Sequence, residues 1–296
     1  MQPVLYLKDV MQRLDASEET SLEEESQLKD TIKRRIEEIK AQSHASSFGV
    51  SLGIIQDFRM PFFLWNSSYT VDLFTLEDLK LFLAYAKNTQ RAYFIDVGAN
   101  IGLHSYVAFR LGFKVISLEP DPQTRLDYLK FIEELNSIKV TQTNSFVDFK
   151  SSLNLIAAGA SNQTVSTDFV RLKSNAFGNH ILGAKRNVYG DYEIIKVNLI
   201  DVRNSLQDNQ FIKIDAEGHD HVVFAAILEH LAFSRSKAII ALCDWRDENS
   251  ENLLGLLENT NMRCGLNKMD TTKLTTDYSR IRGSKRDDFV LTLFEP

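Results

Sequence analysis

The sequence predicts an α/β protein with a doubly wound, mostly parallel sheet and an N-terminal helical extension. From residue 93 onward, apolar runs of strand length alternate with segments of helical periodicity, which is the pattern of βαβ units. The chain has 296 residues, of which 44% are apolar, and this suffices for one large core. We expect a helical extension and lead-in segment over residues 1–85 and the main domain over residues 86–296.

The N-terminal extension is expected to contain a long charged helix. Residues 17–42 are dominated by Glu, Lys and Arg, and they carry one apolar stripe formed by Leu28, Ile32, Ile36 and Ile39. The stripe spans only about two to three heptads, which is short for a free coiled coil. We therefore expect the helix to pack on the body of the protein. Formation of a homodimer through this helix is the alternative.

The other elements follow from the same periodicities. A serine-rich stretch, residues 44–51, separates the charged helix from an aromatic cluster at residues 62–65 that is expected to form a small antiparallel element. Helices are expected over residues 73–87, 101–110, 122–135, 222–231 and 250–258, and strands over residues 93–97, 114–118, 153–161, 164–172, 193–199, 238–243 and 288–294, with one more strand beginning at residue 211.

The most informative stretch is FIDVGANIG, residues 94–102, where an apolar strand runs into a glycine turn and a helix follows. Gly98 lets the backbone approach a ligand closely, and Gly102 lets the helix pack on the strand it has left. The next strand ends in Glu119, about 20 residues beyond the turn, where a carboxylate can accept hydrogen bonds from both hydroxyls of a ribose. This arrangement predicts a site for a nucleotide-like ligand at the carboxyl edge of the sheet.

Two polar residues in the turn favour S-adenosylmethionine over a dinucleotide. Asn100 replaces the second glycine that lets a pyrophosphate lie against bare backbone, and Asp96 precedes the first glycine. S-adenosylmethionine has no phosphate and carries an amino acid head that suits such side chains. A buried strand with a glycine turn and a capping aspartate is the structural alternative.

A third strand, ending in the small residues Ala158 to Asn162, is expected to reach the same crevice. Small residues leave room for a flat ring, so an adenine could lie over this segment with a polar contact from Ser161 or Asn162. The alternative is a strand that leads into a hairpin with residues 164–172. The glycine-rich residues 175–189 are expected to form a mobile loop across the mouth of the site.

A second polar cluster follows the strand that begins at residue 211. If the extended conformation continues, Asp215, Glu217 and His219 share one face and can converge on a substrate hydroxyl or on a divalent ion. The alternatives are structural: Asp215 holds a loop amide, Glu217 caps the next helix, and His219 lies in its first turn. Lys213, within an otherwise apolar strand, must reach solvent or a carboxylate such as Glu217.

The bulk composition narrows the class of partners. A formal net charge of −6 gives no general attraction to phosphate backbones, so no nucleic-acid partner is expected. We expect a cytoplasmic protein without a signal peptide, because the first residues lack a basic region followed by a long apolar run, and no apolar run is long enough to span a membrane. The two cysteines, Cys243 and Cys264, lack metal-ligand spacing, and no disulfide is expected.

Taken together, four segments resemble the FkbM-type methyltransferases, which depend on S-adenosylmethionine: FIDVGANIGLHS, LEPDP, AAGAS and FIKIDAEGHD. The resemblance covers about residues 90–245. It implies a class I methyltransferase (Rossmann-like) fold and methyl transfer to an oxygen, typically a hydroxyl of a sugar, glycan or polyketide. It also places Asp96, Gly98 and Asn100 near the methionine part and Glu119 on the ribose. Two departures from the family pattern are Ala160-Ser161-Asn162 after the third strand and Cys243-Asp244 after a later one.

The expected site then has two parts. The residues expected to bind the cofactor are Asp96, Gly98, Asn100, Gly102, Glu119, Ala158 and Ser161. Asp215, Glu217 or His219 is expected to take the proton of a small-molecule or glycan acceptor, directly or through a divalent metal, although no metal site is assigned. An NAD-dependent oxidoreductase and a non-catalytic cofactor-binding module that recruits a partner through its charged helix are the alternatives.

Overall fold

The computed structural model describes residues 4–6, 22–42, 47–51, 58–61, 93–144, 151–173, 178–188, 190–236, 238–243, 250–260, 262–266, 274–282 and 290–294. The aromatic cluster at residues 62–65, the expected helix at residues 73–87 and residue 244 lie outside this description.

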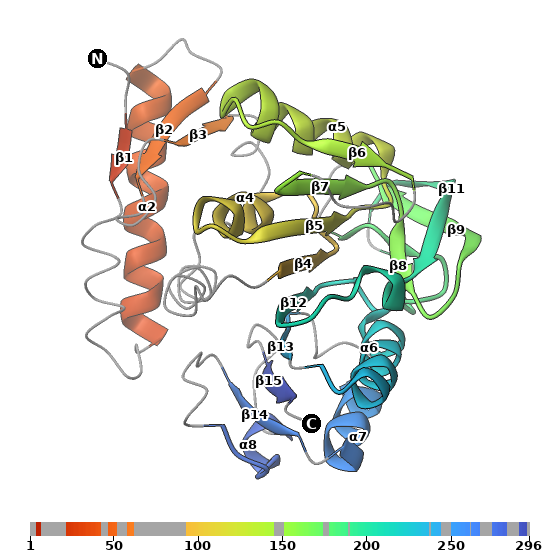
Figure 1. Cartoon of the computed structure of the whole chain (residues 1–296). Coiled ribbons are helices and arrows are strands. Elements are labelled where there is room, and N and C mark those ends of the chain that lie inside the picture. The colour runs from red at the N-terminus through yellow and green to blue at the C-terminus, as the bar shows by residue number, and fades with distance from the viewer. Residues whose placement is uncertain are drawn as a thin grey trace.

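The main sheet has eight strands in the order β14-β15-β13-β12-β4-β5-β7-β6 (Figure 1). Their bounds are Tyr93–Val97 (β4), Lys114–Leu118 (β5), Thr141–Thr143 (β6), Leu153–Ile156 (β7), Gln210–Ile214 (β12), Ala238–Leu242 (β13), Arg263–Leu266 (β14) and Val290–Phe294 (β15). The six neighbours from β6 to β13 are parallel, and β15 is antiparallel to both β13 and β14. The predicted doubly wound, mostly parallel sheet is confirmed, while β6 and β14 were not predicted.

The chain reverses its direction across the sheet between β4 and β12. From β4 it proceeds outward through β5 and β7, and it then returns to place β12 on the other side of β4. In open α/β sheets this switch point opens a crevice at the carboxyl ends of the strands, where ligands bind. The glycine turn after β4 and the acidic segment after β12 therefore lie at the same place.

Helices cover both faces of the main sheet. They are α4 (Leu103–Arg110), α5 (Pro122–Leu129) with a π-helical continuation η3 (Lys130–Leu135), α6 (Asp220–Ser234), α7 (Ser250–Thr260) and α8 (Ser279–Arg282). Successive strand residues point to opposite faces, and Phe94 accordingly belongs to a different buried cluster from Ile95. The central strands are mostly apolar because both faces are buried, and Asp96 of β4 and Lys213 of β12 are the buried charged exceptions.

A smaller sheet, in the order β10-β9-β11-β8, follows the carboxyl end of β7 (Figure 1). Its strands are β8 (Gly159–Ser161), β9 (Val165–Leu172), β10 (His180–Ile181) and β11 (Tyr192–Asp201). The single strand expected over residues 153–161 is thus two strands in two sheets. The hairpin alternative is wrong, because β8 pairs in parallel with β11 and not with β9. The segment expected to be a loop over residues 175–189 contains β10, which pairs with β9.

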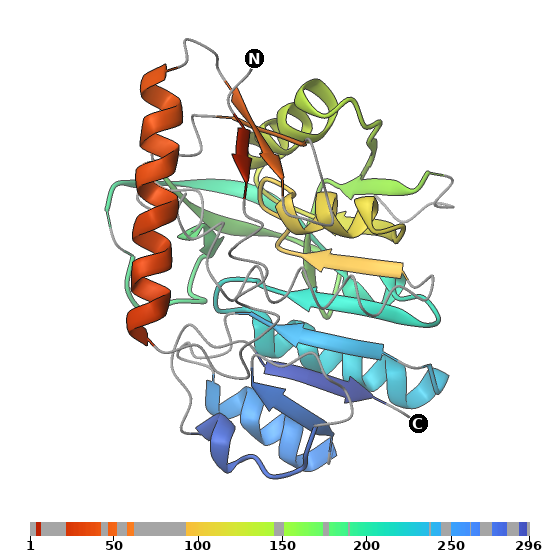
Figure 2. The same cartoon turned by 90° about the vertical axis from the view of Figure 1, so that its left-hand side faces the viewer.

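The N-terminal extension packs on the main domain. Its elements are β1 (Val4–Tyr6), α2 (Leu22–Gln42), β2 (Ser47–Ser51) and β3 (Phe58–Pro61), so the serine-rich stretch contributes a strand rather than a spacer. Figures 1 and 2 show α2 along the side of the molecule opposite β9 and β11. Ile32, Ile36 and Ile39 are each at most 3% exposed and belong to the same buried cluster as Phe94, as expected for a helix packed on the body.

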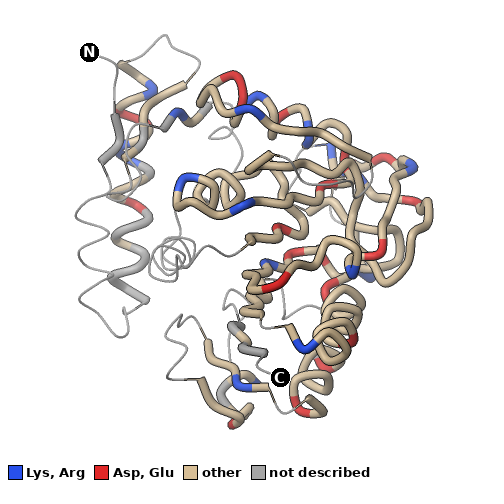
Figure 3. The backbone as a smooth tube through the Cα atoms, viewed as in Figure 1, with Lys and Arg blue, Asp and Glu red and all other residues tan. Residues whose placement is uncertain are grey.

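A side-chain amide links β3 to the end of η3. Asn136 Oδ1 accepts a hydrogen bond from the Arg59 backbone N–H at 2.8 Å, and Asn136 Nδ2 donates to the Arg59 carbonyl at 3.0 Å. Charges of both signs are interspersed along the described chain (Figure 3). Within the described residues, no helix combines the length and the apolar character that crossing a bilayer requires.

Candidate active site

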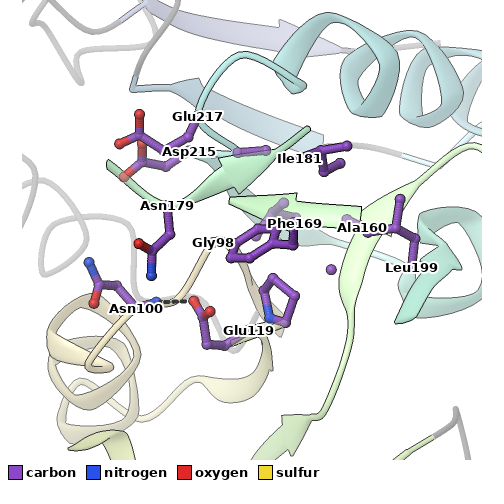
Figure 4. Close-up of a pocket in the computed structure, with 14 residues that line it drawn as sticks. Gly98, Asn100, Glu119, Ala160, Phe169, Asn179, Ile181, Leu199, Asp215 and Glu217 are labelled. Atoms are coloured by element: carbon purple, nitrogen blue, oxygen red, sulfur yellow. Dashed lines mark hydrogen bonds between the residues drawn. The ribbon is translucent and has the colours of Figure 1, made fainter. Parts of the chain in front are cut away.

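A pocket lies at the carboxyl ends of β4, β5 and β12, and residues of the smaller sheet form its opposite wall (Figure 4). Its accessible volume is about 140 Å³. The main sheet contributes Gly98, Asn100, Glu119, Asp215 and Glu217 to the lining.

The glycine turn after β4 is tightly constrained. The backbone N–H groups of Gly98 and Ala99 both donate to the Leu118 carbonyl, at 3.1 and 3.0 Å, which fastens the turn to the end of β5. Gly98 has φ +71°, and a Cβ at this position would lie 1.9 Å from the Asp215 carbonyl oxygen. Only glycine fits here, because the backbones of the two chain segments touch.

Gly102 has a packing role and does not line the pocket. A Cβ at residue 102, where φ is +85°, would lie 2.4 Å from the ring of Tyr128 on α5. The residue therefore allows α4 to begin close against α5, in keeping with the helix-packing role expected of it. The cofactor-binding role that was also expected of Gly102 receives no support from this placement.

Asn100 presents an unsatisfied acceptor to the pocket. Its backbone N–H donates to Glu119 Oε2 at 2.9 Å, while its side-chain Oδ1 is buried with no partner among the described residues. The residue has φ +50°, a left-handed conformation that asparagine tolerates better than most residues. A buried acceptor without a donor is costly, so this atom marks a place where a ligand donor fits.

Glu119 is held with both carboxylate oxygens engaged. Oε1 accepts from the Asp121 backbone N–H at 2.9 Å, and Oε2 accepts from Asn100. The residue is only 6% exposed, and this burial raises the pKa of Glu119 to about 7. Each oxygen retains one lone pair that can accept a ligand hydroxyl.

Asp96 lies beneath the pocket rather than in its wall. Its side chain is fully buried, and its Oδ2 accepts a hydrogen bond from Ser105 Oγ at 2.6 Å. A chain of hydroxyl contacts continues from Ser105 to Ser117 at 2.7 Å and from Ser117 to Tyr128 at 2.8 Å. The aspartate is thus part of a buried polar network that supports the glycine turn.

Lys213 contacts two carboxylates and a backbone carbonyl. Its Nζ lies 3.2 Å from Asp96 Oδ1 and 3.2 Å from Asp215 Oδ2, and it donates to the Gly98 carbonyl at 3.1 Å. Burial alone would lower the pKa of Lys213, but the carboxylates of Asp96 and Asp215 raise it above its usual value. The lysine thus reaches carboxylates, one of the two outcomes expected, whereas Glu217, the carboxylate given as an example, pairs with Lys185.

The expected shared face of Asp215, Glu217 and His219 does not form. β12 ends at Ile214, and the backbone then turns through Glu217 at φ +48° and Gly218 at φ +91°. Asp215 and Glu217 line the pocket, whereas His219 does not. The extended conformation stops because Gly218 follows and α6 begins directly after it.

His219 links two parts of the framework. Its Nε2 lies 3.1 Å from Ser161 Oγ on β8. Burial lowers the pKa of His219 to about 4, and the nearby His221 adds to this effect, so the ring is neutral at pH 7. Ser161 itself is 3% exposed, and neither Ser161 nor the fully buried Ala158 lines the pocket. The small residues that do are their neighbours Gly159 and Ala160.

Asp220 is a structural residue that the sequence reading missed. Its carboxylate accepts from the backbone N–H groups of Ala216 at 2.9 Å and Gly218 at 3.1 Å, and it holds the turn that presents Asp215 and Glu217. The N-cap of α6 is His219, whose side chain forms no cap hydrogen bond. The position of Asp220 in the first turn of α6, two residues after Gly218, was a usable signal.

The opposite wall of the pocket consists of residues that the sequence did not single out. Phe169, Ile181 and Leu199 come from β9, β10 and β11, and together with Gly159 and Ala160 of β8 in the same sheet they form an apolar surface (Figure 4). The pattern along residues 165–172 predicts a strand, but the sequence alone does not show which face of that strand meets the crevice.

Asp121 fastens this wall to the main sheet. It is 1% exposed and caps α5 by accepting from the Gln123 N–H at 3.0 Å. Arg171 Nε of β9 donates to Asp121 Oδ1 at 2.9 Å, and Asn179 Nδ2 donates to Asp121 Oδ2 at 3.0 Å. Asn179 in turn lines the pocket.

The described residues contain no group of three or more His, Cys, Asp or Glu side chains arranged to hold a metal ion.

This chain is similar to solved methyltransferase structures, with which it shares little sequence identity. A methyltransferase FkbM from Methylobacillus flagellatus is 15% identical with a TM-score of 0.42, covering 70% of this chain and 47% of that one. The chain thus spans about half the length of that protein. An SAH-bound methyltransferase, PaMTH1 from Podospora anserina, is 10% identical with a TM-score of 0.45, covering 89% of this chain and 96% of the other. No curated protein matches the sequence.

The family of the chain is shown by a match over more than half of its length. The model of the methyltransferase FkbM domain matches residues 96–259, which is more than half of the chain. The match includes the glycine turn, Glu119 and the acidic segment after β12. The doubly wound sheet is accordingly that of a class I methyltransferase, and the chain belongs to the FkbM methyltransferase family.

Proposed function

We propose that this protein transfers a methyl group from S-adenosylmethionine to a hydroxyl oxygen of a sugar, glycan or polyketide-type small molecule. The observation that carries the proposal is the pairing of Asn100 and Glu119 across the glycine turn. A buried acceptor without a partner lies beside a buried carboxylate that has lone pairs to spare. Both groups suit a ligand rich in hydrogen-bond donors.

The chemistry of the pocket fits the parts of this cofactor. The Asn100 side-chain oxygen suits the amino group of the methionine part, and Glu119 suits the two ribose hydroxyls. The apolar surface that Phe169 and Ile181 form with Ala160 suits a flat ring such as adenine. Gly98 lines the pocket and lets the turn lie against the Asp215 backbone. We therefore assign cofactor binding to these residues and not to Ala158 or Ser161.

When bound, the cofactor supplies an electrophilic methyl group on a sulfonium centre. The chain's own task is to orient the acceptor hydroxyl and to accept its proton, since orientation and proton transfer each lower the barrier. Asp215 is the residue we assign to the proton, because one of its oxygens is held by Lys213 while its carboxylate lines the pocket. Glu217, paired with Lys185, borders the mouth through which an acceptor enters.

The two alternative functions make different predictions. An NAD-dependent oxidoreductase would bind a dinucleotide, and Asn100 occupies the position at which a glycine would admit the pyrophosphate. A non-catalytic module would bind the cofactor and turn nothing over. The fold alone does not separate these cases, since similar sheets support unrelated chemistries.

The first experiment is thermal unfolding with S-adenosylhomocysteine, with NADH and without ligand. A ligand at 100 times its Kd stabilises the native state by about 2.7 kcal/mol, which shifts Tm by several degrees for a chain of this size. Stabilisation by S-adenosylhomocysteine alone supports the proposal and leads to an acceptor screen that begins with glycans. Stabilisation by NADH alone contradicts it.

A further inference from the structure

A buried lysine lies at the point where the two halves of the site meet. Lys213 is 2% exposed within the apolar strand β12. An ammonium group carries three donors, and three acceptors surround this one: Asp96 Oδ1 at 3.2 Å, the Gly98 carbonyl at 3.1 Å and Asp215 Oδ2 at 3.2 Å. Each donor therefore has an acceptor.

These acceptors belong to two different strands. Asp96 and Gly98 lie at the end of β4, and Asp215 follows the end of β12. The parallel register places Lys213 directly opposite Asp96, so the ammonium bridges the switch point of the sheet. A displacement of Lys213 would release the glycine turn and the Asp215 side chain together.

We propose that Lys213 is a positioning residue that fixes the Gly98 turn and one oxygen of the Asp215 carboxylate, and so leaves the other oxygen of Asp215 for the ligand. The role in binding and turnover rests on the proposed function. The role in holding the turn does not, because it concerns contacts within the chain. Lys213 itself does not line the pocket and so acts only through its neighbours.

The charges of Lys213, Asp96 and Asp215 determine which variant can test the positioning role of Lys213. Asp96 and Asp215 carry two negative charges against one positive charge on Lys213, and Asp96 is fully buried. The single change Lys213→Met would leave a buried carboxylate without its counter-ion, which is strongly destabilising. The double change Lys213→Met with Asp96→Asn removes one charge of each sign and keeps an oxygen for Ser105. We expect this variant to fold.

The positioning role is tested by two measurements, each made on the double variant and on the wild type. The first is amide hydrogen exchange at Gly98 and Ala99, whose N–H groups bond to Leu118, with the amide of Val115 as an internal reference in β5. The second is the affinity for S-adenosylhomocysteine by calorimetry, followed by kcat and KM once an acceptor is known. Exchange needs no ligand, so it tests the positioning role even if the proposed function fails.

A matched control removes an ion pair of the same kind from the surface. Lys196 contacts Asp168 at 2.8 Å, and its side chain is 69% exposed. Lys196→Met with Asp168→Asn makes the same two changes as the double variant but touches neither β4 nor the pocket. Surface pairs contribute little to stability, so this variant should match the wild type in exchange and in affinity.

In the double variant we expect faster exchange at Gly98 and Ala99 and an affinity lower by about 10–100-fold, since small displacements of supporting groups have effects of this size. Unchanged exchange together with an affinity within about threefold of wild type would overturn the proposal. If the double variant does not unfold cooperatively, Lys213→Arg takes its place. Its planar guanidinium keeps the charge but cannot match the three directions of the ammonium, and wild-type exchange and affinity in that variant would equally overturn the proposal.

Discussion

The α-carbon of Gly98 lies directly against the backbone carbonyl of Asp215. A Cβ on residue 98 would approach that oxygen to 1.9 Å, and the Asp215 N–H donates to the Val97 carbonyl at 3.2 Å. The turn expected to bind the cofactor and the residue assigned to the acceptor proton are thus joined through their backbones. Neither can move without the other.

The first prediction concerns this contact. Gly98→Ala should abolish S-adenosylhomocysteine binding and lower the free energy of unfolding, because the methyl group must push the Asp215 backbone aside. The left-handed φ of +71° alone costs an alanine about 1–2 kcal/mol, and the overlap adds roughly 1–3 kcal/mol. Chemical denaturation and calorimetry measure the two effects.

Gly112→Ala is the matched control for this change. Gly112 has φ +92°, yet a Cβ there meets nothing within 4 Å. This variant should lose only the conformational part of the stability and should bind S-adenosylhomocysteine as the wild type does. Equal losses of stability in the two variants would show that the contact with Asp215 has no energetic weight.

The second prediction is a pH dependence of cofactor affinity. The pKa of Glu119 is raised to about 7 by burial, and only the ionised carboxylate offers both oxygens as acceptors to the ribose. Affinity for S-adenosylhomocysteine should therefore be low at acidic pH, rise as the pH increases through 7 and level off above it. Calorimetry between pH 5.5 and 8.5 measures this, and Glu119→Gln should remove the rise because it has no proton to lose. An unchanged rise in Glu119→Gln would place the titrating group elsewhere.

The raised pKa of Glu119 has the opposite effect on the stability of the ligand-free protein, which falls as the pH rises. Because the folded pKa of Glu119 lies above the unfolded value of about 4.3, the native state binds the extra proton between these two values. Its contribution to stability is fully present below the unfolded pKa and is lost as the pH rises towards 7. Glu119→Gln should flatten this part of the stability profile, as measured by urea unfolding at several pH values.

The third prediction separates the residues considered as bases. Asp215→Asn should lower kcat by about 10²–10⁴-fold while the protein still binds S-adenosylhomocysteine. His219→Ala should keep kcat within about tenfold of wild type, because the ring contacts Ser161 on β8 and does not line the pocket. A large loss of kcat in His219→Ala with wild-type stability would contradict this assignment.

The fold and the location of the site could be predicted because their signals are local. The turn at Gly98 and the acid at Glu119 lie in consecutive βα units, and the rules for open parallel sheets bring them to one edge. Apolar strands with both faces buried also stand out in the sequence. Burial of the stripe at Ile32, Ile36 and Ile39 followed from helical spacing in the same way.

What could not be predicted depends on pairing between distant segments. Lys213 was expected to reach solvent or a carboxylate such as Glu217, but which carboxylate it reaches depends on the register of β12 beside β4, which brings it opposite Asp96, 117 residues away. β8 pairs with β11 across an intervening strand, so the apolar wall with Phe169 is invisible in the sequence. His219 was misplaced for a local reason, since the turn at Gly218 ended the extended conformation that the interpretation assumed.

The last prediction concerns the anchor of that wall. Asp121→Asn keeps an oxygen to cap α5, since asparagine is an equally good cap, but it removes the charge that holds Arg171. A hydrogen bond to a charged group contributes about 1.5–3 kcal/mol, so the strands β9 and β10 should open more often than the main sheet. Amide exchange in β9 should become faster, and affinity for S-adenosylhomocysteine should fall because Phe169 and Asn179 lose their fixed positions.

The same arginine provides the control. Arg171 Nη1 also donates to Glu193 at 2.9 Å, on a carboxylate whose side chain is 48% exposed. Glu193→Gln removes the solvent-screened ion pair between Arg171 and Glu193. It should leave amide exchange in β9 and the affinity for S-adenosylhomocysteine close to wild type. If Glu193→Gln and Asp121→Asn had equal effects, the wall would depend on the overall charge around Arg171. A larger effect of Asp121→Asn means that the buried carboxylate, which also holds Asn179 at 3.0 Å, is what fixes the smaller sheet over the pocket.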